Sequence, residues 1–131
     1  MNTWQRVWRV GIAPLLSPTA LSALAAALRS DDPRLVQGAT TDPMPIAIFA
    51  SLPVEGACAV SFGLWQGHGL DRVGTLHQAF RRLCRSADDL LDESLATTAF
   101  INWFDETPRD EMRQLLLAEI EQQTAQPRQA A

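Results

Sequence analysis

The chain contains no lysine and no tyrosine among its 131 residues. The missing lysine excludes Schiff-base chemistry and the phosphate-binding lysine of a Walker loop. The missing tyrosine excludes a phenol that acts as a general acid or as a donor to an oxyanion. All eleven basic residues are arginine, a usage that a GC-rich bacterial genome is enough to explain.

Positive charge is also scarce, since the formal net charge is −4. Proteins that bind nucleic acid usually carry a basic excess, because their cations displace counterions from phosphates. Arg81, Arg82 and Arg85 form a local cluster, but acids follow it directly. The composition therefore argues against a nucleic-acid partner, and an arginine-based module at this cluster is only a third hypothesis.

Two cysteines, Cys58 and Cys84, are too few for a disulfide framework. Free thiols are typical of a reducing compartment, so the sequence predicts a cytoplasmic protein. Arg6 and Arg9 precede an uncharged run over residues 10–28, as basic residues do in a signal peptide. Prolines and hydroxyl side chains interrupt that run, which favours a helix boundary and leaves it too broken to span a membrane.

Charge is scarcest in the middle of the chain. Residues 36–70 contain two charged side chains, Asp42 and Glu55, where the overall 20% would give about seven. They also contain five of the seven glycines and three of the eight prolines. Disordered segments are usually rich in charge and poor in bulky apolar groups. We therefore expect this segment to be buried, either against the rest of the chain or against a partner.

Helix starts are the clearest local signal in the sequence. A capping residue directly precedes proline at Ser17-Pro18, Asp32-Pro33 and Thr107-Pro108, and Asp42-Pro43 is a fourth candidate. The cap oxygen accepts a hydrogen bond from an unpaired backbone N–H, and proline at the first helical position loses no bond. These pairs predict helices, or a single turn after Asp32, directly after them.

The apolar periodicity predicts a mainly α fold of about five helices around the irregular, Gly/Pro-rich centre. One domain is expected over residues 1–121, followed by a disordered tail over 122–131. Thr75 and Gln78 form a capping-box pattern, and Ser94 can cap the next helix. The predicted helices cover roughly residues 4–16, 18–28, 75–91, 95–104 and 108–120.

The central segment allows two structures. Two alternating runs separated by residues 53–56 fit a short β-hairpin over residues 46–64. A helix would instead place Val54, Cys58, Phe62 and Trp65 on one face. An isolated hairpin is marginal without further packing, and every neighbouring segment is predicted helical, so we favour broken short helices. The alternating residues are Ile46, Ile48, Ala50 and Leu52, then Cys58, Val60, Phe62 and Leu64.

Glu55, Cys58 and His68 are the candidates for nucleophilic chemistry, as orienter, thiolate and base. Such chemistry needs a lowered thiol pKa and hydrogen-bond contact, which a sequence cannot show. With His77 and Cys84, the same cysteine and histidine do not match the ligand spacing of a zinc site. We therefore predict no metal and no cofactor.

The acids at positions 88, 89, 92 and 93 lack the ligand order and the glycine of a calcium loop. They are expected to form a solvated helix face or a helix junction. The sequence contains neither the Gly-x-Ser-x-Gly nor the His-Glu-x-x-His signature of known hydrolases.

By elimination, the sequence favours a non-enzymatic interaction or accessory protein. It would act by burying an apolar patch against a partner protein or a second copy of itself. Phe49, Phe62, Trp65 and Leu70 are the candidate interface residues. The alternative is a small enzyme or ligand-binding domain with a pocket around Glu55, Cys58 and His68.

Overall fold

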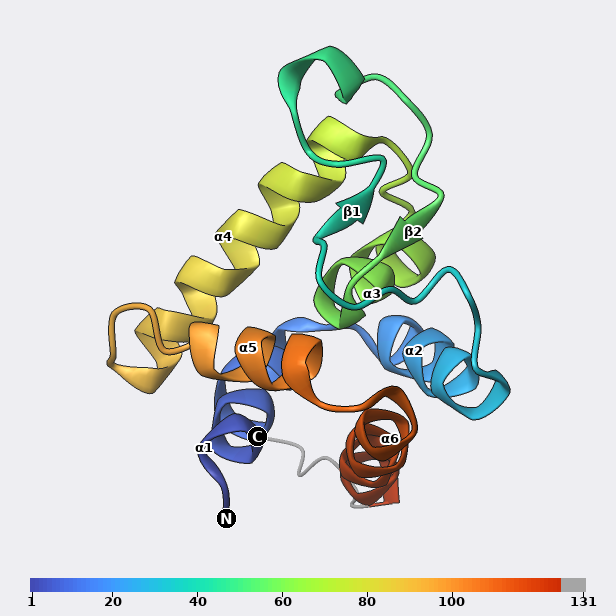
Figure 1. Ribbon diagram of the computed structural model, residues 1–131. Coiled ribbons are helices and arrows are strands. Elements are labelled where there is room, and N and C mark those ends of the chain that lie inside the picture. Colours follow the sequence, from blue (N-terminus) through green and yellow to red (C-terminus); the bar gives the residue numbers. More distant parts are fainter. Residues whose placement is uncertain (126–131) are drawn as a thin grey trace.

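Helices dominate the computed structural model, which describes residues 1–125 (Figure 1). Six α-helices and one small antiparallel sheet of two strands confirm the predicted mainly α fold. The helices are α1 (Thr3–Arg6), α2 (Pro18–Ser30), α3 (Ala59–His68), α4 (Val73–Leu91), α5 (Thr98–Glu106) and α6 (Arg109–Ala125). The strands are β1 (Thr41–Asp42) and β2 (Gly56–Ala57).

The predicted N-terminal helix changes its hydrogen-bond pattern twice. After α1 the chain continues as a π-helix over Val7–Ile12 and a 3-10 turn over Ala13–Leu15. Gly11 in the π-helix lies against α4, because a Cβ there would lie 2.7 Å from Leu91 Cδ1. Four large apolar side chains of this segment, spaced as on one helical face, are all buried: Trp4, Val7, Trp8 and Ile12.

Helix α2 begins where the sequence predicted. Ser17 Oγ accepts a hydrogen bond from Ala20 N at 3.1 Å, and Pro18 is the first helical residue. Helix α3 crosses α2 closely because Gly67 has no side chain. A Cβ at Gly67 would lie 2.3 Å from Ala20 Cα, so only glycine allows this approach.

The alternating runs do not form a hairpin over residues 46–64. The first run contains a 3-10 turn, Ala47–Phe49, and the second becomes α3, as the favoured prediction of short helices had it. Residues 56–64 are buried without exception, so the apparent alternation was one of large and small buried side chains. A helix that is buried on all sides carries no period that distinguishes it from a strand.

The two strands that do pair lie outside the predicted runs. Thr41 is opposite Ala57, and Asp42 is opposite Gly56. Asp42 ends β1, so Asp42-Pro43 does not open a helix as the fourth capping pair was expected to do. Pro33 and Arg34 form a turn after Asp32, whose Oδ1 accepts from Arg34 N at 2.9 Å, but the predicted turn does not extend to Gln37, because Leu35 instead forms a bridge with Ala57.

Helix α4 begins two residues before the predicted cap at Thr75. Its N-cap is Arg72, which makes no side-chain capping bond. The first N–H groups instead donate to the central segment, from Val73 to Leu52 O at 3.0 Å and from Gly74 to Ala50 O at 2.9 Å. Tertiary hydrogen bonds therefore satisfy the first backbone N–H groups of α4, which a capping side chain normally satisfies.

Asp88, rather than the predicted Ser94, organises the start of α5. Its carboxylate accepts hydrogen bonds from Leu95 N at 3.1 Å and Thr97 N at 2.8 Å. Helix α6 starts one residue after Pro108, whose carbonyl accepts from Met112 N at 2.9 Å. A side chain from the end of α4 thus replaces the expected local cap.

The predicted tail over residues 122–131 begins inside α6, which continues to Ala125. Gln123 Oε1 accepts a hydrogen bond from Trp8 Nε1 at 2.9 Å, so this end of α6 contacts the N-terminal helix. Residues 126–131, the rest of the predicted tail, lie outside the described residues.

Candidate functional site

The three candidates for nucleophilic chemistry are not brought together. Cys58 precedes the first residue of α3 and His68 is its last, so about 15 Å of helix lies between them. Glu55 is exposed, whereas Cys58 is buried. His68 Nε2 accepts a hydrogen bond from Ser17 N at 3.3 Å, which ties it to the start of α2.

Neither thiol has the environment of a nucleophile. Burial raises the pKa of Cys58, and its thiol donates to Ser61 Oγ at 3.5 Å. Burial also raises the pKa of Cys84 to about 11. Catalytic cysteines need a lowered pKa and access to solvent, so the geometry gives no support to a thiolate mechanism.

Over residues 1–125, no group of three or more His, Cys, Asp and Glu side chains is placed to hold a metal ion. The acidic cluster at residues 88–93 lines a hollow at the end of α4. Within it, Asp88 already holds the backbone before α5 through the two bonds described above. Asp88 therefore has a structural role in the turn between α4 and α5.

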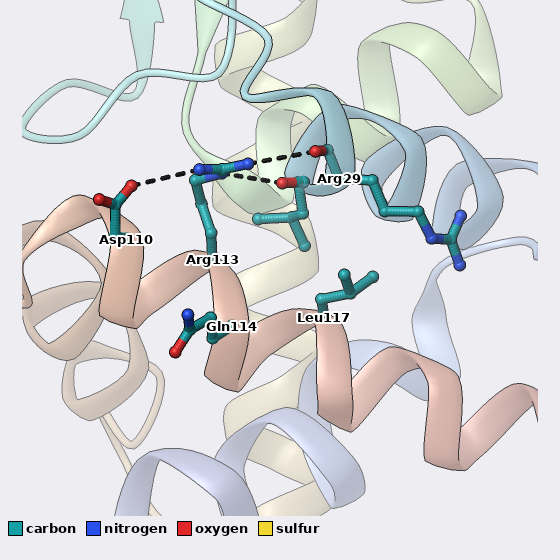
Figure 2. A pocket seen from close by; sticks show the side chains of 6 residues that line it. Arg29, Asp110, Arg113, Gln114 and Leu117 are labelled. Carbon is teal, nitrogen blue, oxygen red and sulfur yellow. Dashed lines mark hydrogen bonds and ion pairs between the residues drawn. The ribbon is translucent and has the colours of Figure 1, made fainter.

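A second hollow, of about 440 Å³, lies between the end of α2 and the start of α6 (Figure 2). Figure 2 shows Arg113 at the edge of this hollow, with hydrogen bonds to three neighbouring residues. Its guanidinium donates to Leu28 O at 2.8 Å, to Arg29 O at 3.1 Å and to Asp110 Oδ1 at 3.2 Å. These bonds satisfy carbonyl groups in the last turn of α2. Arg113 therefore has a structural role, because it holds α6 against the end of α2.

The predicted interface residues differ in accessibility. Phe62 keeps 1% of its surface exposed and lies edge-on to Trp65, with ring centroids 5.8 Å apart. It is a core residue and cannot reach a partner, because it lies in the part of α3, residues 59–64, that is buried throughout. Trp65, Leu70 and Phe49 are half-buried. The guanidinium of Arg34 covers the Trp65 ring at 5.5 Å from its centroid.

The exposed large apolar residues of the charge-poor segment, residues 36–70, all lie in the loop over residues 43–53, which we call the apolar loop. In Figure 1 it stands out from the body of the molecule at the top of the view, beyond the first turn of α4. Ile48 keeps 78% of its surface exposed and Met44 keeps 57%. No charged residue occurs within it. Its exposed or half-buried large apolar residues are Met44, Ile46, Ile48, Phe49 and Leu52.

The apolar loop is held at its base by backbone hydrogen bonds. Besides the two bonds to the first turn of α4, Glu55 N donates to Asp42 O at 2.7 Å and Val54 N donates to Asp71 O at 2.9 Å. Gly74 lies directly against the loop, since a Cβ there would lie 2.8 Å from Ala50 Cβ. The loop is therefore positioned by α4 and by the β1–β2 pair.

Sequence reasoning found the segment and only one of the loop residues, Phe49. It missed the exposure of Met44, Ile46, Ile48 and Leu52, because uncharged apolar residues are usually buried. One available signal was proline, at positions 43, 45 and 53, which prevents both a continuous helix and a paired strand. A charge-free run broken in this way has no regular element with which to bury its side chains.

No protein-family model, no curated protein and no solved structure matches this chain. None of the helices in the described part of the chain is both long enough and apolar enough to cross a membrane. The apolar loop contains four of the nine exposed large apolar residues found in residues 1–125.

Proposed function

We propose that this chain is a non-enzymatic interaction protein that buries its apolar loop against a partner protein or a second copy of itself. One observation carries the proposal: a charge-free loop presents four exposed large apolar side chains together on a fixed base. Contiguous exposed apolar surface on a protein usually marks an interaction site. The free, largely buried cysteines are consistent with a cytoplasmic setting.

The energetics favour this surface as the centre of an interface. Complete burial of one Ile or Met side chain contributes about 1.5–3 kcal/mol. Most binding energy usually comes from a few such anchors at the centre of a contact. Because backbone bonds already hold the base of the loop, little entropy is lost when it docks. Ile48 is the most exposed of the loop residues and is the expected anchor.

Phe49 and Leu70 fit this proposal better than Phe62 does. Phe49 belongs to the apolar loop, and Leu70 precedes Asp71, whose carbonyl holds Val54 at the loop's base. Both are half-buried, so they can extend the contact around the exposed anchors. Trp65 lies on α3, half-buried beneath the Arg34 guanidinium, and we assign it no part in this contact.

The test is Ile48→Gln, with Leu115→Gln on α6 as the matched control. Both positions are exposed, so neither change should lower the free energy of unfolding by more than about 0.5 kcal/mol. We expect Ile48→Gln to weaken association at least tenfold, a loss of about 1.4 kcal/mol, and Leu115→Gln to leave it unchanged.

Association would be measured by sedimentation of the purified chain and by quantitative recovery of bound proteins from cells that encode it. The two variants and the wild type would be compared at equal concentration. A partner or dimer held equally well by wild type and Ile48→Gln would contradict the proposal.

A further inference from the structure

Three acidic residues occur at the base of the apolar loop. The β1–β2 pairing places Asp42 beside residues 55 and 56, and the bond from Val54 to Asp71 brings that acid to the same base. Asp42, Glu55 and Asp71 are all exposed. Arg72 is the neighbouring cation, and its contact with Asp71 is long, at 3.9 Å between exposed groups. We call the three carboxylates the acidic neck.

The acidic neck is electrostatically uncompensated. In residues 1–125, neither Asp42 nor Glu55 takes part in an ion pair, and the Asp71–Arg72 contact is too exposed to contribute much. The whole chain is acidic as well, with a net charge of −4. A partner that seats the loop must therefore approach these three carboxylates.

We propose that the partner is a different protein whose apolar cleft is bordered by arginine or lysine side chains. The inference rests on the proposed function, which allows either a partner protein or a second copy of this chain. It selects the partner protein. Oppositely charged borders around an apolar contact steer association and exclude wrong partners. An apolar tip with an acidic neck matches a cleft with an apolar floor and a basic border.

The charges of the acidic neck disfavour the two other possible binding partners of the loop, a second copy of this chain and an anionic membrane. In a symmetric dimer through the loop, the same patch meets itself, so two acidic necks would face each other across one contact. Each copy would bring three carboxylates to the contact and only one neighbouring cation, Arg72, to offset them. An anionic membrane surface repels the neck for the same reason, since loops that insert into such membranes are bordered by basic residues.

The experiment uses a photo-reactive p-benzoylphenylalanine at position 48 of the full chain, expressed in cells that encode the protein. The same group at position 115 is the control. The protein that cross-links at position 48 alone is identified, purified and titrated against wild type, Ile48→Gln and the triple variant Asp42→Asn, Glu55→Gln, Asp71→Asn. A triple variant with the same charge change elsewhere, Glu106→Gln, Glu111→Gln, Glu121→Gln, is the charge control; all three of these glutamates are exposed.

We expect the neutral neck to weaken binding about tenfold and the charge control to change it less than twofold. Raising the salt concentration should weaken wild-type binding by a similar factor and affect the neutral neck much less, because salt screens exposed charges. Ile48→Gln should weaken binding at every salt concentration, since the apolar contact does not depend on screening.

The possible failures separate the inference from the proposed function. If the neutral neck binds as well as wild type while Ile48→Gln binds weakly, the apolar docking stands and the basic border is wrong. A cross-link to a second copy of this chain would likewise support the apolar docking and contradict the basic border. If no protein cross-links at position 48 beyond the control, or if Ile48-dependent binding is found only to vesicles of phosphatidylcholine and phosphatidylglycerol, both proposals fail.

Discussion

At the scale of single residues, the two cysteines show how burial changes chemical character. Cys58 lies at the start of a helix, a position that normally lowers a thiol pKa. Its burial has the opposite effect and dominates, because a thiolate is poorly solvated inside the core. Position along the helix therefore says little about reactivity until the surrounding packing is known.

Both thiols should react slowly with a thiol reagent at neutral pH. The raised pKa values of Cys58 and Cys84 leave almost no thiolate, and burial limits access to Cys58. We expect labelling with a chromogenic disulfide to be at least a hundredfold slower in the folded protein than in urea. Selective, fast labelling of Cys58 in the folded state, with a Cys84→Ser variant as control, would instead favour the enzyme hypothesis.

At the scale of elements, the fold depends on how closely α2 and α3 approach. Two glycines of α3 face α2, but they differ in what lies opposite. A Cβ at Gly67 would collide with the backbone of Ala20, whereas a Cβ at Gly63 would lie 3.4 Å from Leu16 Cδ2, an ordinary contact. Helix propensity favours alanine at both positions, so packing alone separates them.

Gly67→Ala should destabilise the protein by about 2 kcal/mol or more, because backbone atoms of α2 must move to admit the methyl group. Gly63→Ala should be neutral or stabilising by up to about 1 kcal/mol, since the helix gains propensity at little steric cost. Urea unfolding of the two variants followed by helical circular dichroism gives both values. Equal destabilisation by the two changes would show that the α2–α3 contact is looser than the structure has it.

At the scale of the whole molecule, a buried carboxylate joins the two ends of the described chain. Glu119 on α6 is buried and accepts hydrogen bonds from Arg9 at 2.6 and 2.7 Å and from Gln5 at 2.8 Å. The hydrogen bond from Arg9 is the main cause that lowers the pKa of Glu119. The same helix closes the end of α2 through Arg113, so α6 links the N-terminal helix to α2.

Glu119→Gln should lower the free energy of unfolding by about 1–2 kcal/mol at neutral pH. Because the folded pKa of Glu119 lies below the unfolded one, its stabilisation is present above the unfolded value near 4.5 and is lost as pH falls through the lowered folded pKa. The difference between variant and wild type should therefore shrink in acid.

Urea titrations of both proteins from neutral pH to about pH 3 measure this difference, with the exposed Glu121→Gln as control. A difference that stays constant over the whole range would mean that the ionised carboxylate contributes nothing to stability. In that case the contact between α6 and the N-terminal helix would depend on packing alone.

The sequence by itself determined the mainly helical fold and most of the buried faces. The cap at Ser17-Pro18 and the apolar stripe of the first helix hold because they depend on contacts a few residues apart, whereas the predicted stripe of the last helix loses Leu115, which is 40% exposed. Such local signals predict the existence of a helix well, since capping bonds and periodicity are properties of neighbouring residues.

Only the tertiary structure decided where α4 and α5 begin and how the charge-poor segment is divided. Val73 and Gly74 find their acceptors in the central segment, and Asp88 reaches the backbone before α5. The low charge of residues 36–70 indicated burial, and burial holds for α3, which packs on α2. It does not hold for the apolar loop, which forms only a 3-10 turn over Ala47–Phe49 and is not covered by any other part of residues 1–125.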